Sequence, residues 1–366
     1  MTFYYTLYAV FLAFIFVELS PSFRLKKRLM ICWSIFFVIY GGIRWNTGGD
    51  WDQYYSHFLY SNWNNIFNYD RNGNETLEPG FVFLNALIKS IFKEYYFFNI
   101  FTLAVIEYGI YKFCIKFGQN HPWIPFIMFN LGVLFPVRAG LSLGVCYLAF
   151  LKIKERKLVQ FLIILGIAFL IHNQCIALLP LYWLGKLKIK DCYILVLYVF
   201  FAISTALLQD VFILLSLTIG GNVAEKAYMY TQIETEGFKG ASYMGWVLNF
   251  FFLCVYLYVG KKTKVRDSEW YNLLINGFLV YMLIMFAFQD GMGDLARLSS
   301  LYFPVQVILF TNAFCYFTNQ ARGVYGLLAV CFVVAYFIYK WSGICDGYYF
   351  KDNTVPYKTI FDYNMI

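Results

Sequence analysis

The chain has 366 residues, of which 61% are hydrophobic and only 14% are charged, and its formal net charge is +8. A soluble globular domain carries about 25% charged residues, so this composition, with a mean hydropathy of +0.59, excludes that class. The basic residues form short clusters between long apolar runs, a pattern that indicates membrane orientation and argues against a nucleic-acid partner.

The apolar runs are long, continuous and non-alternating, which predicts an all-α polytopic integral membrane protein rather than a β-barrel. Positive charge in short loops marks the cytoplasmic side of a membrane. On this rule the basic clusters placed inside are 24–28, 112–116, 152–157, 186–190, 261–266 and Arg322. The chain then reads as a single membrane domain, 1–366, of about twelve spans with both termini outside. The expected spans are 3–19, 29–43, 96–117, 121–137, 139–151, 158–172, 174–185, 191–208, 242–260, 270–288, 300–319 and 323–342.

The largest outer segment, 44–95, follows the second span and changes abruptly from apolar to polar and aromatic residues. Its second part begins at Glu78 and continues with apolar residues at helical spacing over 81–92. Because about twelve residues are too few to cross a bilayer, we expect a helix that lies in the membrane interface. The first part of the segment carries the candidate site residues Arg44, Asp50, Trp51 and Tyr54.

Two helical hairpins are too short for an ordinary membrane crossing. Region 121–151 has Arg138 in its middle, and region 158–185 has His172 in its middle. Basic clusters flank both regions at each end, so each region must cross the membrane twice. Each arm of about 15 residues is roughly 22 Å long, against a hydrocarbon core of about 30 Å. A sunken polar turn cannot face lipid. We therefore expect Arg138 and His172 near the floor of a cavity that opens to the outside.

The remaining outer segments are 209–242, the stretch with Asp294 and Arg297 at the start of a helix, and the tail 343–366. No CxxC or HExxH spacing occurs, so we predict neither a metal site nor a cofactor. Walker A and Rossmann patterns are also missing from the sequence. These features favour an extracytoplasmic or membrane-borne substrate.

Several segments together resemble the EpsG family of Wzy-type polysaccharide polymerases. They are GGIRWNTGGDWDQYYSHF, EPGFVFLNALIKSIF, PVRAGLSLGVCYLAF, KLVQFLIILGIAFLIHNQCIALLPLYWL, ARLSSLYF and PYKTIF, in this order along nearly the whole chain. One difference from the family pattern is Ala139, where the family usually has a glutamine after the arginine.

The resemblance implies an enzyme, a membrane glycosyltransferase of O-antigen or exopolysaccharide biosynthesis in the bacterial inner membrane. Such a polymerase transfers a growing glycan from undecaprenyl diphosphate to a new lipid-linked repeat unit on the periplasmic face. The partners that the resemblance implies are the two undecaprenyl-diphosphate-linked oligosaccharides, donor and acceptor, together with membrane lipid and a chain-length regulator.

This chemistry assigns roles to the outer polar residues. Arginine suits the developing charge of a lipid diphosphate, so Arg44, Arg138 and Arg297 are candidate substrate-binding residues. An acceptor hydroxyl needs a general base and the sugar centre a carboxylate, for which His172, Glu78 and Asp50 are candidates. The further substrate-binding candidates are Asp294, Trp51 and Tyr54.

Ordinary structural roles compete with each assignment. Arg44 and the tryptophans suit a membrane interface, and Asp50 suits a turn or a helix cap. Glu78 could pair with a lysine, His172 could be a hydrogen-bonded core residue, and Asp294 and Arg297 could form a helical ion pair. The rival function is a flippase for lipid-linked oligosaccharides, which would distribute charge through the bilayer rather than on one side.

Overall fold

The structure is a computed structural model in which residues 2–70, 77–132, 137–205, 243–288, 297–320 and 354–365 are described, together with positions 207, 208, 210, 211, 214, 335 and 338. The described part is all-helical, and its β-type pairing is limited to one isolated antiparallel bridge between Arg44 and Thr359. The helical fold class that the apolar runs predict is therefore present.

Three helices of the described residues are long and apolar enough to cross a membrane: Tyr95–Phe117, Glu269–Ala287 and Arg297–Asn319. Shorter apolar helices are Tyr4–Ala13, Pro79–Phe92, Leu158–Ile171 and Asp191–Ile203. The full set of about twelve spans stays a prediction. One expected span, 174–185, is not a continuous α-helix: it consists of η2 (Asn173–Leu178) and α9 (Leu181–Leu184), separated at Pro180, which has no N–H to continue the helical hydrogen bonds.

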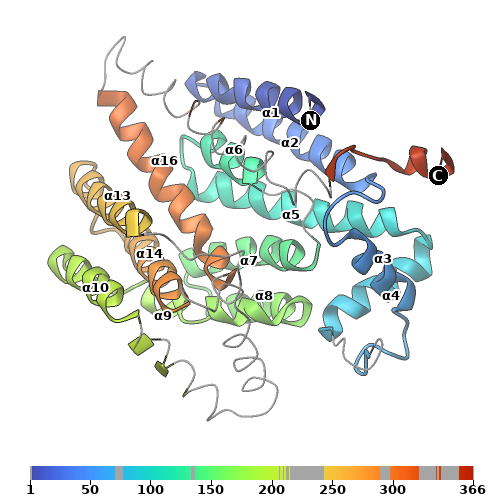
Figure 1. The fold of residues 1–366 in the computed structure, drawn as a ribbon. Helices are drawn as coiled ribbons and strands as arrows, with labels where there is room; N and C mark the ends of the chain where they lie inside the picture. The colour runs from blue at the N-terminus through green and yellow to red at the C-terminus, as the bar shows by residue number, and fades with distance from the viewer. Residues whose placement is uncertain are drawn as a thin grey trace. The chain divides into compact units, whose positions relative to one another are not determined.

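The chain divides into two compact units, the first formed by 1–176 with 317–366 and the second by 177–316. In chain order, the helices of the first unit are α1 (Thr2–Ala13), η1 (Phe14–Leu19), α2 (Phe23–Gly42), α3 (Trp51–Tyr60), α4 (Pro79–Phe92), α5 (Tyr95–Phe117), α6 (Trp123–Gly132), α7 (Arg138–Lys154), α8 (Leu158–Ile171) and η4 (Ile360–Met365). In this unit α2, α5, α7 and α8 pack in sequence, each against the next (Figure 1).

Helices α5 and α7 approach closely because each has a glycine at the contact. A Cβ atom on Gly144 would lie 2.7 Å from the Cα of Ile106, and one on Gly109 would collide with the carbonyl oxygen of Gly144. Small residues allow helix backbones in a membrane to come this near. The glycine pair therefore sets the spacing of α5 and α7, and α7 begins at Arg138.

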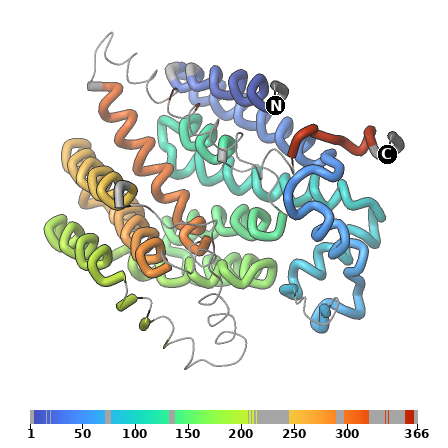
Figure 2. The backbone as a smooth tube through the Cα atoms, in the orientation of Figure 1, coloured from blue at the N-terminus to red at the C-terminus, as the bar shows by residue number. Residues whose placement is uncertain are grey.

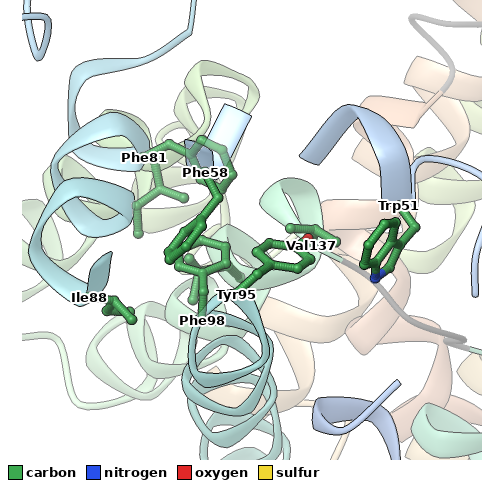
Figure 3. Close-up of a cluster of buried hydrophobic side chains, with 9 residues drawn as sticks. Trp51, Phe58, Phe81, Ile88, Tyr95, Phe98 and Val137 are labelled. Atoms are coloured by element: carbon green, nitrogen blue, oxygen red, sulfur yellow. The ribbon is translucent and has the colours of Figure 1, made fainter. Parts of the chain in front are cut away.

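Helices α3 and α4 gather at the end of the first unit where α5 and α7 begin (Figures 1 and 2). An aromatic cluster joins them to α5: the rings of Phe58, Phe81 and Tyr95 surround Phe98, and Trp51 lies beside Tyr95 (Figure 3). The helix expected over 81–92 is present as α4, and its place in a membrane interface stays a prediction. This packing makes α3 and α4 a fixed cap on the helix bundle rather than loose loop segments.

The second unit contains α9, α10 (Asp191–Ile203), α13 (Tyr243–Lys262), α14 (Glu269–Ala287), η3 (Arg297–Tyr302) and most of α16 (Phe303–Gln320). Helix α14 is its centre and packs against α9, α10 and η3. The Asn276 side chain on α14 donates to the carbonyl oxygens of Leu184 and Leu187, at 2.7 and 2.9 Å. These bonds satisfy the free carbonyls at the end of α9.

Candidate functional site

Glu78 stands at the N-cap of α4, immediately before Pro79. Proline is favoured at the first helical position because its fixed φ suits the helix and its missing N–H is not needed there. Gly80 follows, and a Cβ atom on it would lie 2.7 Å from the carbonyl oxygen of Leu170. The glycine therefore lets the first turn of α4 rest directly on the last turn of α8, and this contact brings Glu78 beside His172.

The Glu78 carboxylate accepts three hydrogen bonds, which come from the start of α7, the end of α8 and the start of η2. Arg138, the first residue of α7, donates from Nη1 to Oε2 at 3.1 Å. His172, the residue that ends α8, meets Oε1 through Nδ1 at 3.0 Å, and the backbone N–H of Asn173 donates to the same oxygen at 3.1 Å. We call Glu78, Arg138 and His172 the Glu78 centre.

The Glu78 centre is partly accessible, with 14% of the Glu78 side chain, 25% of the Arg138 side chain and 12% of the His172 side chain exposed. Burial acts to raise the pKa of Glu78, but the hydrogen bond from His172, the charge of Arg138 and the Asn173 N–H outweigh it and lower that pKa to about 2. Glu78 is therefore an ionised acceptor with both oxygens engaged, which makes it a weak base.

The contact with Glu78 fixes how the His172 imidazole carries its proton. A carboxylate only accepts hydrogen bonds, so Nδ1 of His172 must be the protonated nitrogen. In the neutral ring the lone pair then lies on Nε2, the nitrogen that faces away from Glu78. This arrangement makes Nε2 able to take a proton from a hydroxyl group, while Glu78 holds the ring and stabilises the imidazolium that forms.

Helix α3 adds Tyr54 and Asp50 to the surroundings of the Glu78 centre. The Tyr54 ring packs edge-on against Phe81 in the first turn of α4, at 5.9 Å between centroids, and its backbone N–H donates to the Asp50 carbonyl at 3.0 Å. Burial raises the pKa of the Tyr54 phenol, and the neighbouring Arg138 guanidinium opposes that rise. Tyr54 therefore lies next to Arg138, with Asp50 one helical turn earlier at the N-cap of α3.

Arg44 and Trp51 lie deeper than the Glu78 centre. Arg44 is 2% exposed, and burial lowers its pKa while the phenols of Tyr95 and Tyr357 favour the charged form. The C-terminal segment covers it, since Trp45 N–H donates to the Lys358 carbonyl at 2.9 Å. Trp51 is 5% exposed and stacks on Tyr55 at 4.9 Å. Both residues support the end of the unit, and substrate contact by either of them stays a prediction.

Arg297 begins η3 in the second unit and is exposed, and Asp294 lies outside the described residues, so their expected pairing is not described. The described residues contain no group of three or more His, Cys, Asp or Glu side chains that could hold a metal ion.

The structure also contains two buried carboxylates that are not among the candidate residues predicted from the sequence. Glu107, in the middle of α5, is 4% exposed and accepts from Ser34 of α2 at 2.9 Å. Glu18, at the end of η1, accepts from Lys26 at 2.6 Å and from the N–H groups of Trp123 and Ile124 at 2.9 and 3.2 Å. An acidic residue inside an apolar run is the signal that would have found both.

The fold and the site define a helical membrane protein with a polar, charged centre at one end of its first unit. The chain belongs to the EpsG family, whose model matches residues 27–359. Membership indicates a function of the polysaccharide-polymerase type, exercised by a membrane protein. No curated protein matches the chain, and no solved structure does either.

Proposed function

We propose that this protein is a polysaccharide polymerase that transfers a growing glycan from undecaprenyl diphosphate to a new lipid-linked repeat unit on the periplasmic face of the inner membrane. The observation that supports the proposal most strongly is the Glu78 centre, in which a partly exposed arginine and a histidine meet on one ionised carboxylate. Family membership supports the same class of reaction.

In the proposed reaction, the Nε2 atom of His172 accepts the proton of the acceptor hydroxyl as its oxygen attacks the anomeric carbon of the donor glycan. The new bond joins that oxygen to the anomeric carbon, and the bond from this carbon to the diphosphate oxygen breaks. Undecaprenyl diphosphate leaves with the bonding electron pair. Glu78 serves as a positioning residue that holds the imidazole and compensates its positive charge.

Arg138 would bind the diphosphate. One of its nitrogens, Nη1, contacts Glu78, and a guanidinium has further N–H donors for phosphate oxygens. A fixed cation next to the leaving group is worth most when charge develops there in the transition state. Asp50 and Tyr54, on the α3 side of Arg138, are the residues we assign to contacts with the sugar.

Deletion of the gene distinguishes a polymerase from a flippase. When surface polysaccharide is separated on a gel, loss of a polymerase leaves single repeat units and removes the long ladder. Loss of a flippase removes both. The second pattern would overturn the proposed function.

Purified protein tests the site assignment with a lipid-linked repeat unit as substrate. His172→Ala and Arg138→Ala are expected to lower the polymerisation rate by about 10²-fold or more, as expected when a general base or a charge-stabilising donor is lost. His121→Ala is the matched control, because His121 contacts a different carboxylate, Glu18, at 3.2 Å. Wild-type rates in both site variants would contradict the assignment.

A further inference from the structure

A polar pocket of about 650 Å³ lies within the second unit, where α13 ends and α10 and α14 begin. We call it the basic pocket. Two carboxylates, of Asp191 and Asp267, face it together with a larger number of cations. Its basic side chains are Lys188, Lys190, Lys261, Lys264 and Arg266.

The back of the basic pocket is built around Arg266, which is 7% exposed. Its guanidinium donates to Asp191 Oδ1 at 2.8 Å, to Asn272 Oδ1 at 2.5 Å and to the Ile189 carbonyl at 2.9 Å. These three bonds connect the start of α10, the first turn of α14 and the loop before α10. The wall of the pocket is therefore preformed and does not depend on a ligand to assemble it.

One of the two carboxylates in the basic pocket, that of Asp191, is already engaged by cations. Asp191 pairs with Arg266 and, through Oδ2, with Lys261 at 2.7 Å. Among the described residues, no ion pair engages Lys188, Lys190 or Lys264. These three ammonium groups share the pocket with one further carboxylate, of Asp267, so an excess of positive charge remains whose repulsion a bound anion would remove.

Two further features of the basic pocket favour an anion. Asn272, at 2% exposure, lines the pocket and has no partner for its Nδ2 donor among the described residues. The N-termini of α10 and α14 both lie at this pocket, and the N–H groups at the start of a helix attract negative charge. An acceptor-rich anion satisfies the lysines and the helix ends together, which a neutral sugar does not.

We propose that the basic pocket binds a phosphate group, carried by an anionic membrane lipid or by a soluble phosphate. The charge rule places the segments 186–190 and 261–266 on the cytoplasmic side, where basic pockets between membrane helices bind anionic headgroups. This site belongs to the second unit, and its proposal does not depend on the polymerase chemistry assigned to the Glu78 centre in the first unit.

The test uses the full-length protein in detergent and follows its thermal unfolding midpoint during titration with phosphatidylglycerol, with phosphatidylcholine or with inorganic phosphate. The variant K188Q/K190Q/K264Q neutralises the rim. R24Q/K27Q/R28Q is the matched control, since it removes three positive charges from a cluster outside the pocket. K188R/K190R/K264R keeps the charge and should keep binding.

Phosphatidylglycerol is expected to raise the midpoint of the wild type, the control and the arginine variant more than phosphatidylcholine does. The glutamine variant should bind it on the order of 100-fold more weakly, given the usual contribution of three lysines to binding of anionic headgroups. A response to inorganic phosphate alone, with the same dependence on the lysines, identifies a soluble ligand instead and also supports the site.

The proposal is overturned if the glutamine variant binds both probes as tightly as the wild type. The glutamine variant is expected to fold, because it removes mutual repulsion and no described ion pair. Its midpoint without any added ligand should therefore equal or exceed that of the wild type, and a lower midpoint would contradict the repulsion on which the proposal rests.

Discussion

The first unit contains two carboxylates with nearly the same set of partners. Glu78 receives Arg138, His172 through Nδ1 and one backbone N–H. Glu18 receives Lys26, His121 through Nδ1 and the N–H groups that begin α6. The Glu18 centre lies where α2 and α6 begin, and the Glu78 centre lies where α4 and α7 begin and α8 ends.

The difference between the two centres lies in the cation. Lys26 is sealed, with 6% of its side chain exposed, and its ammonium is shared between Glu18 and the Asn120 carbonyl at 3.0 Å. The Arg138 side chain is 25% exposed and contacts Glu78 through one nitrogen of its guanidinium group. A buried lysine that is bonded to a carboxylate and a carbonyl inside the protein holds the helices together. An accessible arginine with spare donors can also bind an anion, which is why the Glu78 centre alone suits a reaction.

Replacing Glu78 by glutamine should give the largest functional effect. The change removes the charge that pairs with Arg138 and replaces one of the two acceptor oxygens with an NH2 donor, so the tautomer of His172 is no longer fixed and we expect the polymerisation rate to fall by about 10²–10⁴-fold. The rate is measured on purified protein with a lipid-linked repeat unit. A variant that polymerises at the wild-type rate would show that the carboxylate is not needed to position the histidine.

The corresponding change at the other centre, Glu18→Gln, should act on stability instead. It leaves the Lys26 ammonium buried without a carboxylate, which costs about 3–5 kcal/mol of unfolding free energy, with the rate per folded molecule unchanged. Thermal unfolding in detergent measures the loss. The double variant E18Q/K26M should recover most of it, because both charges are then absent. If Glu18→Gln were as stable as the wild type, the Glu18 centre would not have the stabilising role that we assign to it.

Gly80→Ala tests whether the spacing of α4 and α8 matters for the Glu78 centre. The new methyl group meets the Leu170 carbonyl and must push Glu78 away from His172, so we expect the polymerisation rate to fall about tenfold. Gly166→Ala on α8 is the matched control, because nothing lies within 4 Å of its Cβ position. Equal rates for the two variants would mean that the site tolerates the displacement.

The smallest effect concerns pH. The pKa of Glu78 is lowered from 4.5 to about 2, so its contribution to stability is fully present above pH 4.5 and is lost as the pH falls toward 2. The difference in unfolding free energy between wild type and Glu78→Gln should therefore stay constant above about pH 4.5 and shrink below it. A difference that is constant from pH 5 down to 3 would argue against an ionised, hydrogen-bonded Glu78.

The sequence predicts the helical class, and it selects Arg138 and His172 because short hairpins between basic clusters force polar turns onto one face. Glu78 is selected because the chemistry that the resemblance implies needs a carboxylate. The direct contact among these residues was not predictable, since it depends on how Gly80 packs on Leu170. The buried position of Arg44 also could not be foreseen. Its cover comes from residues such as Lys358, which contacts Thr47 across 311 positions, and local patterns carry no information about such pairs.

The packing of the C-terminal segment over Arg44 has a consequence for biogenesis. The backbone of Ile43 accepts from Ile360 N–H at 2.9 Å, so the strip that covers Arg44 is among the last parts of the described chain to leave the ribosome. Until then, the end of α2 remains open while every helix of the first unit from α1 to α8 has already been translated. The end of α2 is therefore closed only after all the helices from α1 to α8 have been made.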